Sequence, residues 1–200
     1  MKTSIKTLIA TSLTAIVLST TVFSTNVSAS TVRPLAVSAV KGFKKISIGG
    51  NVEVTLIQKP ATGVAYTDDN EGTAKIMQEG DMLRVTSTSG TTAKIIVYVD
   101  NIYRIEANEN AVVKTEGKLN SQYLQIFLKG NAHAEINTTT EGLYTVIEDQ
   151  ADLKLSGSTD NHTLVMGKEQ KLTMDKFAAL KTNMSSVEIK AVEKEIASNN

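Results

Sequence analysis

The two histidines of this 200-residue chain, His133 and His162, are the side chains best suited to acid–base chemistry near neutral pH. Neither lies at a recognisable spacing from a serine nucleophile and a carboxylate. The sequence also contains neither a Gly-x-Ser-x-Gly nor a His-Glu-x-x-His motif. We therefore predict no catalytic residues and no enzymatic activity.

An acidic loop has a spacing that suggests calcium. Asp68, Asn70 and Glu79 occupy positions one, three and twelve of a calcium-loop pattern. Gly72 takes a ligand position, however, and Thr73 replaces the glycine that the sharp turn requires. The chain has no cysteine, which excludes thiolate metal sites and disulfides. We predict a solvated loop, no metal site and no cofactor.

Side-chain amides recur at Asn110, Asn131 and Gln150. Amides offer both donors and acceptors, so a stack of them could line a carbohydrate groove. Asparagine also tolerates the left-handed backbone conformation of tight bends, and we favour this structural role. The three residues are nevertheless candidate binding positions.

These amides belong to an internal repeat, which indicates the elements that position them. Aligning Asn110, Asn131, Gln150 and Glu169 gives offsets of 21, 19 and 19 residues. On both sides of each bend, alternate positions match in residue type between units. One such column is Ile105, Ile126, Thr145 and Leu164. Each arm thus alternates inward and outward with period two, as half-buried strands do.

Repeats of this length indicate a stacked architecture. One unit cannot bury a core by itself, but stacked units pair every strand with the rungs above and below. We therefore predict an all-β solenoid of parallel strands over residues 41–197, with rungs of about 19–21 residues. A β-sandwich gives no reason for residue types to recur at matching positions. The segment from Ala191 to Ala197 is expected to cap the last rung.

In this register, Glu106, Phe127, Val146 and Val165 form one outward row. An apolar stripe on a solvated face can mark a partner surface, so Phe127, Val146 and Val165 are candidate binding residues. The interpretation that we favour is internal cover, by a segment such as Thr31 to Val40 or by the C-terminal tail. Acidic residues at outward positions do not cluster, as a polysaccharide-active enzyme would need. Such an enzyme is the least favoured alternative.

The N-terminus has the features of an export signal. Lys2 and Lys6 precede an uncharged run, and Val27-Ser28-Ala29 places small residues where a signal peptidase cleaves. We predict a signal peptide at residues 1–29 and a linker at residues 30–40. The run is shorter than the roughly 20 apolar residues that span a membrane. We therefore expect no stable membrane insertion after cleavage, and an exported protein in the periplasm, at the cell surface or secreted.

The charge balance argues against a nucleic-acid partner. Cleavage after residue 29 removes two of the 21 basic residues and none of the 21 acidic ones, which leaves a formal charge of −2. A surface that neutralises phosphates needs a basic excess.

The segment from Phe43 to Gln58 carries a family resemblance. Its pattern, Phe43-x-x-Ile46-x-Ile48-Gly49-Gly50-Asn51-Val52-Glu53-Val54-x-Leu56-x-Gln58, resembles the opening of the putative auto-transporter adhesin head GIN domain family, a domain of unknown function common in Bacteroidetes. Later segments are similar too, including Gly80-Asp81-x-Leu83-x-Val85, and the resemblance covers about residues 40–190. It implies a right-handed parallel β-helix, export, and no assigned enzymatic activity.

Two functions fit these observations. The first is an exported binding or adhesin-like protein that contacts an extracellular glycan or protein through the apolar stripe or the bend amides. The alternative is a structural envelope protein that acts through self-association at an open end of the solenoid.

Overall fold

The computed structural model describes residues 40–186, whose regular structure is all β-strand. The early strands are short, whereas the last three have 15 residues each. The strands are β1 (Lys45–Gly50), β2 (Val52–Gln58), β3 (Gly63–Tyr66), β4 (Lys75–Glu79), β5 (Met82–Ser87), β6 (Ala93–Val99), β7 (Arg104–Asn108), β8 (Val112–Glu116), β9 (Leu119–Asn120), β10 (Tyr123–Leu128), β11 (His133–Ile147), β12 (Asp152–Met166) and β13 (Lys171–Ser185).

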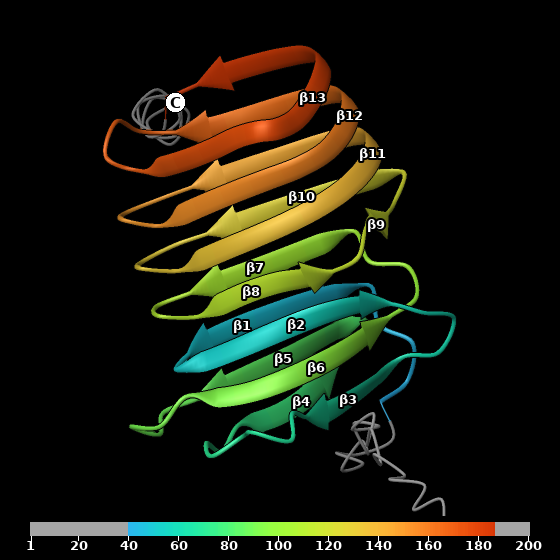
Figure 1. Ribbon diagram of the computed structural model, residues 1–200, viewed down its shortest axis with the longest axis vertical. Coiled ribbons are helices and arrows are strands. Elements are labelled where there is room, and N and C mark those ends of the chain that lie inside the picture. Colours follow the sequence, from blue (N-terminus) through green and yellow to red (C-terminus); the bar gives the residue numbers. More distant parts are fainter. Residues whose placement is uncertain (1–39, 187–200) are drawn as a thin grey trace, which may run out of the picture. The chain divides into compact units, whose positions relative to one another are not determined.

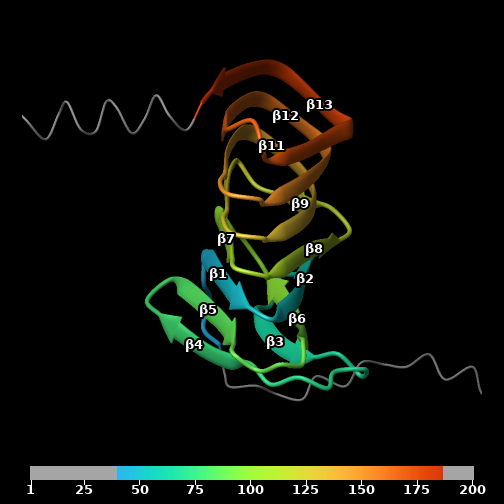
Figure 2. The same cartoon turned by 90° about the vertical axis from the view of Figure 1, so that its left-hand side faces the viewer.

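The strands form one mixed sheet that curls around an apolar interior (Figures 1 and 2). One row of parallel strands contains β5, β1, β7 and β10, and a second contains β6, β2 and β8. The long strands bend and take part in both rows. β11, for example, pairs with β8 through its first residues and with β10 through its last. The two rows are therefore two sides of one curled sheet.

The pairing register matches residues of the internal repeat. Ile105 lies opposite Ile126, and Thr145 lies between Ile126 and Leu164. All four side chains are fully buried. Paired residues are thus separated by 21, 19 and 19 positions. Because side chains alternate along a strand, the matched columns fill one continuous core.

The predicted right-handed parallel β-helix is wrong. The described chain forms a mixed sheet curled into a half-barrel, in which β3 pairs antiparallel with β6 and β4 antiparallel with β5. Gly80 and Asp81 alone connect β4 to β5, and Gly80 has a φ of 60°. A two-residue turn with a positive φ produces a hairpin, so these strands cannot follow a parallel solenoid course.

The half-barrel stays open because each repeat supplies one bent strand and a short connection. Residues 148–151 link β11 to β12, and residues 167–170 link β12 to β13. Connections of this length contribute no further strand that could close the cross-section. The first strands also do not follow the spacing of the repeat, since Ile46 of β1 lies opposite Ile105 of β7.

The interior of the half-barrel is mostly aliphatic, as expected for a chain without tryptophan. Each fully buried Leu, Ile or Val contributes about 1.5–3 kcal/mol relative to an exposed one. Threonines are buried where the long strands bend. Thr138 Oγ1 donates to the Leu119 carbonyl at 2.9 Å, and Thr140 Oγ1 donates to Thr159 Oγ1 at 2.9 Å. The bend therefore leaves these buried hydroxyls paired.

Several predicted segments lie outside the described residues. These are the signal peptide at residues 1–29, the linker up to residue 39 and the capping segment at residues 191–197. Within residues 40–186, no helix has the length and apolar character needed to cross a membrane.

Candidate functional site

Aromatic side chains gather on the outer side of β7, β10 and β11. The register places Arg104, Gln125 and Tyr144 side by side, and Phe127 in the neighbouring outward row. The Phe127 and Tyr144 ring centroids are 5.8 Å apart, and the Arg104 guanidinium carbon lies 5.0 Å from the Phe127 centroid. Arg104 Nε donates to Gln125 Oε1 at 2.8 Å. Together with Tyr123, these four residues form what we call the aromatic face.

Tyr123 is the most exposed ring of the aromatic face, with 59% of its surface accessible. It lies opposite Gly142 of β11. A Cβ at Gly142 would lie only 2.8 Å from Tyr123 Cδ1, so the absence of a side chain there lets the ring lie close to the neighbouring strand. One side of the Tyr123 ring therefore packs against the backbone at Gly142, while the other side is open to solvent.

The predicted apolar stripe overlaps this face. Glu106, Phe127, Val146 and Val165 do form one row across β7, β10, β11 and β12. Phe127 and Val146 are half-buried, whereas Val165 is 2% exposed. A ligand on this side would thus contact Phe127 and Val146 but not Val165.

The candidate amides Asn110, Asn131 and Gln150 lie at the bends that follow β7, β10 and β11, and all three are exposed. Asn131 Nδ2 donates to Asn110 Oδ1 at 3.2 Å, so two of the amides form a short ladder.

The left-handed backbone conformation of these bends belongs to the residue before each amide. Glu109 has a φ of 61°, Gly130 of 72° and Asp149 of 57°. The structure therefore corrects the role that we predicted for the amides. They do not supply the left-handed position, and their side chains remain at the surface.

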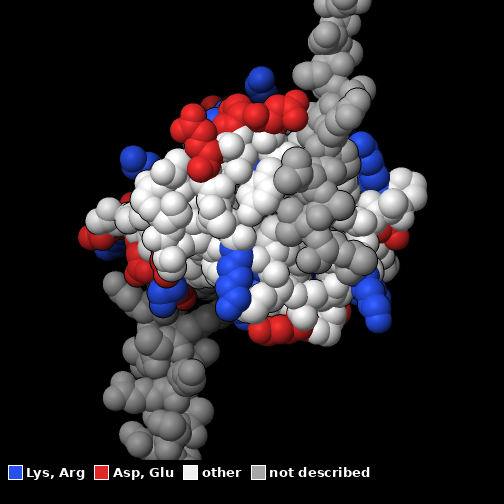
Figure 3. Space-filling model, turned by 90° about the horizontal axis from the view of Figure 1, so that it is seen from below, with Lys and Arg blue, Asp and Glu red and all other residues white. Residues whose placement is uncertain are grey.

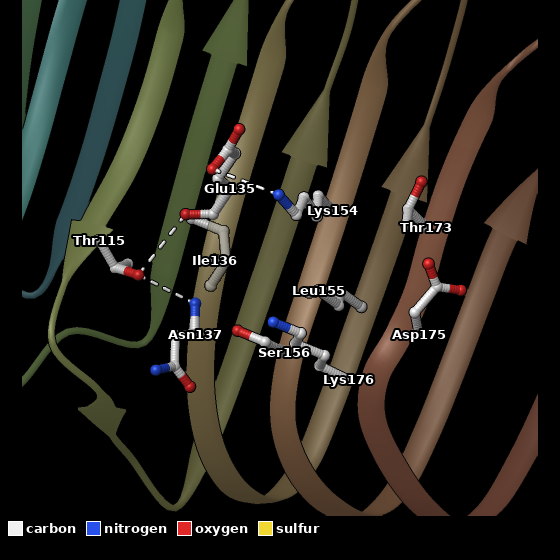
Figure 4. A pocket seen from close by; sticks show the side chains of 10 residues that line it. All are labelled: Thr115, Glu135, Ile136, Asn137, Lys154, Leu155, Ser156, Thr173, Asp175 and Lys176. Carbon is white, nitrogen blue, oxygen red and sulfur yellow. Dashed lines mark hydrogen bonds and ion pairs between the residues drawn. The ribbon is translucent and has the colours of Figure 1, made fainter.

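A polar groove of about 360 Å³ opens across β8, β11, β12 and β13 (Figure 4). Glu135 and Lys154 form an ion pair of 3.8 Å along one side. Thr115 Oγ1 accepts from the Asn137 backbone N–H at 2.9 Å and donates to the Glu135 carbonyl at 3.5 Å. The lining residues are Thr115, Glu135, Ile136, Asn137, Lys154, Leu155, Ser156, Thr173, Asp175 and Lys176.

A β-bulge in β13 shapes the far side of this groove. Lys154 lies opposite Thr173 but Ser156 lies opposite Lys176, so β13 has one extra residue there. Bulges re-aim side chains and often occur near functional sites. The shift places Asp175 and Lys176 at the groove, and neither has an ion-pair partner within residues 40–186.

His133 lies beside the groove in a charged cluster that the sequence did not reveal. Its Nδ1 is 3.1 Å from Asp152 Oδ2, and its Nε2 is 3.4 Å from Glu135 Oε1. The predicted outward position next to Asp152 agrees with this placement. Glu135 is two residues further along the same strand, so alternation puts both side chains on one face.

His162, by contrast, points into the core. It is 1% exposed, its Nε2 lies 3.2 Å from Thr145 Oγ1, and its ring packs edge-on against Phe177. Its Nδ1 has no hydrogen-bond partner among the described residues. Burial disfavours the charged imidazolium and lowers the pKa of His162 below its ordinary value.

The calcium-like loop is held by ordinary hydrogen bonds. Asn70 Oδ1 accepts from the Lys94 backbone N–H at 2.8 Å, and Asn70 Nδ2 donates to the Gly72 carbonyl at 2.9 Å. Glu79 is the last residue of β4 and forms an ion pair of 3.8 Å with Arg84. Across the described part of the chain, no group of three or more histidine and carboxylate side chains is placed to hold a metal ion.

The end of the sheet formed by β3 and β4 is seen directly in Figure 3. Lysine and arginine side chains are scattered over this view, and the largest group of acidic side chains lies along its upper edge, with others at the left and the bottom. On the flanks, charges pair between strands, as Lys114 does with Glu53 at 2.8 Å.

The aromatic face was missed by the sequence analysis apart from Phe127. The same register could have revealed it, because Arg104, Gln125 and Tyr144 share the next outward row and Tyr123 matches Gly142 at an offset of 19. In the sequence, an aromatic residue that matches a glycine at an outward position of the next repeat indicates an exposed ring of this kind.

Comparison with known proteins identifies one family and several similar folds. The family described as "Putative auto-transporter adhesin, head GIN domain" matches residues 42–191. A putative adhesin from Bacteroides fragilis has a TM-score of 0.66 at 19% identity, over 74% of this chain and 73% of that chain. A putative adhesin from Parabacteroides merdae has a TM-score of 0.55 at 13% identity, over 74% and 75%.

A third solved structure is named a putative lipid binding protein, from Parabacteroides distasonis. It has a TM-score of 0.55 at 10% identity, over 74% of this chain and 76% of that chain. No curated protein matches the sequence. At these identities the structural likeness extends to the fold alone.

Proposed function

The chain belongs to the putative auto-transporter adhesin, head GIN domain family, and we propose that it is an exported, non-catalytic module that binds an extracellular glycan. The names of the similar solved proteins and the predicted leader at residues 1–29 support a role at the cell envelope. The observation that carries the proposal is the aromatic face, in which Tyr123 is open to solvent on the same strand as Phe127 and the Phe127 ring contacts that of Tyr144.

The chemistry of the aromatic face suits a sugar ring. An exposed aromatic ring offers a flat apolar surface to the C–H side of a pyranose, while flanking polar groups bond its hydroxyls. Arg104 and Gln125 supply these groups, and Arg104 is held in place by its bond to Gln125. Asn161 and Thr163 continue the same rows on β12. The surface thus combines aromatic rings with polar groups, since Gln125 lies between Tyr123 and Phe127 on β10 and between Arg104 and Tyr144 across the strands.

Ion pairing of the acids near the aromatic face supports a non-catalytic role for that surface. A glycosidase needs two carboxyl groups about 5–10 Å apart that act as acid and as nucleophile or base. Here Glu106 pairs with Arg104 at 3.4 Å, and Glu148 pairs with Lys129 at 3.6 Å. We therefore expect bound polysaccharide to be released intact, with no new reducing ends after prolonged incubation.

A glycan array followed by calorimetry with the best soluble oligosaccharide tests the proposal. Replacing Tyr123 with Ala removes the exposed ring, and we expect binding to weaken about fivefold to tenfold, the usual contribution of an aromatic stacking contact. The Phe127→Ser, Val146→Ser double variant should weaken it further. Circular dichroism should show unchanged β-structure in each variant.

Tyr98 provides a matched control. Its ring also stands near a glycine on an outer face, 3.6 Å from a Cβ placed at Gly63, but it has Lys59 above it and lies on β6. The Tyr98→Ala variant should bind like the parent protein. Equal losses for Tyr98→Ala and Tyr123→Ala, or saturable binding to lipid vesicles instead of glycans, would contradict the proposal.

A further inference from the structure

The last strand, β13, leaves one edge of the sheet open. Among the described strands it pairs with β12 alone, and it lies at the end of the sheet in both views (Figures 1 and 2). Leu180 and Met184 on this strand are 85% and 66% exposed. An edge of 15 residues carries a row of backbone donors and acceptors that can pair with another strand.

Along β13, the positions that point into the core and the positions that point outward are arranged symmetrically about Ala178. Leu172, Thr182 and Met184 lie opposite the buried Leu153, His162 and Leu164, and therefore point inward. Met174 and Phe177 pack against the core, and Ala179 lies opposite the buried Thr159. The inward residues are Leu172, Met174, Phe177, Ala179, Thr182 and Met184, while the other residues from Thr173 to Asn183 face outward.

This symmetric order of inward and outward positions depends on the bulge. Without the extra residue near Asp175, strict alternation through the first half of the strand would give a different order from that in the second half. With it, two consecutive outward residues, Asp175 and Lys176, precede the centre, and two more, Leu180 and Lys181, follow it. The strand is therefore matched to itself when its direction is reversed.

We infer that two copies of the chain join edge to edge through antiparallel pairing of β13, with the two-fold axis at Ala178. In an antiparallel pair, residues directly opposite each other point to the same face. Asp175 then lies opposite Lys181 of the partner copy, and Leu172 opposite the partner's Met184. Each pair occurs twice, so the interface gains two ion pairs and two apolar contacts.

The same pairing covers Leu180, the exposed apolar side chain on the outer face, and extends the core across the interface. Leu180 lies opposite the partner's Lys176, whose aliphatic stem can cover it. Phe177 lies opposite the partner's Ala179, so a large inward side chain meets a small one. The open half-barrel of one copy thus extends into that of the other. This arrangement does not depend on glycan binding.

A head-to-tail alternative is disfavoured by strand length. The other edge strands are β3, with four residues, β4, with five, and β9, with two. None of them matches the 15 residues of β13, whereas β13 matches itself. A self-complementary patch on both copies gives a closed dimer, while head-to-tail contacts give open filaments.

Cysteine cross-linking tests this register directly, because the chain has no native cysteine. An Ala178→Cys variant places the two thiols opposite each other at the axis, at a Cα separation that permits a disulfide. Mild oxidation should convert most of it to a covalent dimer. Ser158→Cys, at the matching position of β12, should give little. Equal yields from the two variants would overturn the inference.

Charge reversal provides a second test, by sedimentation velocity of the full chain over roughly a hundredfold range of concentration. Asp175→Lys places like charges opposite each other twice, and dimerisation should weaken about tenfold or more. Adding Lys181→Asp should restore it to within about threefold of the parent.

Two outcomes of the sedimentation test would overturn the inference. One is a set of open-ended oligomers. The other is a monomer at all concentrations that dimerises only after residues 187–200 are removed, because this would mean that the chain's own tail occupies the edge.

Discussion

His162 combines a polar ring with an apolar environment, and this makes it the residue most sensitive to pH in the described core. It lies in a column of the repeat that otherwise contains Tyr103, Leu124 and Leu143. One ring nitrogen contacts Thr145 and the other has no partner among the described residues. Protonation would place a charge in this apolar interior, which burial opposes.

We expect the free energy of unfolding to fall as the pH drops below about 6.5, the ordinary pKa of histidine. The pKa of His162 is lowered in the folded state. Its contribution is therefore complete above the unfolded pKa and is lost as the pH falls toward the folded pKa, because the unfolded chain binds the proton more readily. Urea denaturation at pH 7 and pH 5 measures this loss.

The His162→Leu variant isolates this contribution from that of the carboxylates. Leucine matches the apolar neighbours and cannot bind a proton, so the stability difference between pH 7 and pH 5 should be smaller than in the parent protein. The same difference in both proteins would mean that His162 takes no part in the acid response.

At the scale of elements, the bent strands determine where the two rows of the sheet meet. β12 reaches its bend at Gly157, which has a φ of 99°. A Cβ here would overlap the carbonyl oxygen of Thr138 on the neighbouring strand. Glycine is therefore required both by the backbone conformation and by the close approach of β11.

We expect Gly157→Ala to destabilise the protein by roughly 3 kcal/mol, from the unfavourable backbone conformation together with displacement of β11. Gly80→Ala is a matched control, since Gly80 also has a positive φ but no atom lies within 4 Å of the added Cβ. It should cost only about 1–2 kcal/mol. Chemical denaturation compares the two, and equal losses would show that the contact with Thr138 adds nothing.

At the scale of the whole molecule, the aromatic face and the β13 edge are separate surfaces. The aromatic face lies on β7, β10 and β11, and the edge lies beyond β12. In the proposed dimer β13 pairs antiparallel with itself, so the row of β7 and β10 in one copy is continued by the row of β8 in the other. The two aromatic faces therefore lie on opposite sides of the dimer. Sites that face apart cannot both contact one flat surface, but they can bridge two glycan-coated surfaces.

We therefore expect the parent protein to cross-link glycan-coated beads, and the Asp175→Lys variant to need an about tenfold higher concentration to do so. Its affinity for a single oligosaccharide in solution should stay within about twofold of the parent value. Bead aggregation and calorimetry provide these measurements. A loss of equal size in both would indicate that Asp175 belongs to the binding site itself.

The order and spacing of residues along the chain are enough to predict the all-β class, the columns of the core and the pairing offsets. The positions of Ile105, Ile126, Thr145 and Leu164 show why, since a strand alternates with period two and a repeat places equivalent residues on the same line. The family was also recognisable from the pattern between Phe43 and Gln58. These features depend on spacing along the chain, which a sequence contains in full.

The curvature of the sheet and the contacts between side chains become visible only in the folded structure. The hairpins at β3 and β4, the open half-barrel and the bulge at Asp175 depend on connection length and on the bending of long strands, and the repeat does not encode these. The contact of His133 with Glu135 and the support of Tyr123 by Gly142 follow from side-chain directions. A repeat specifies which residues stack, whereas contacts across the stack depend on curvature, twist and the room left by neighbouring side chains.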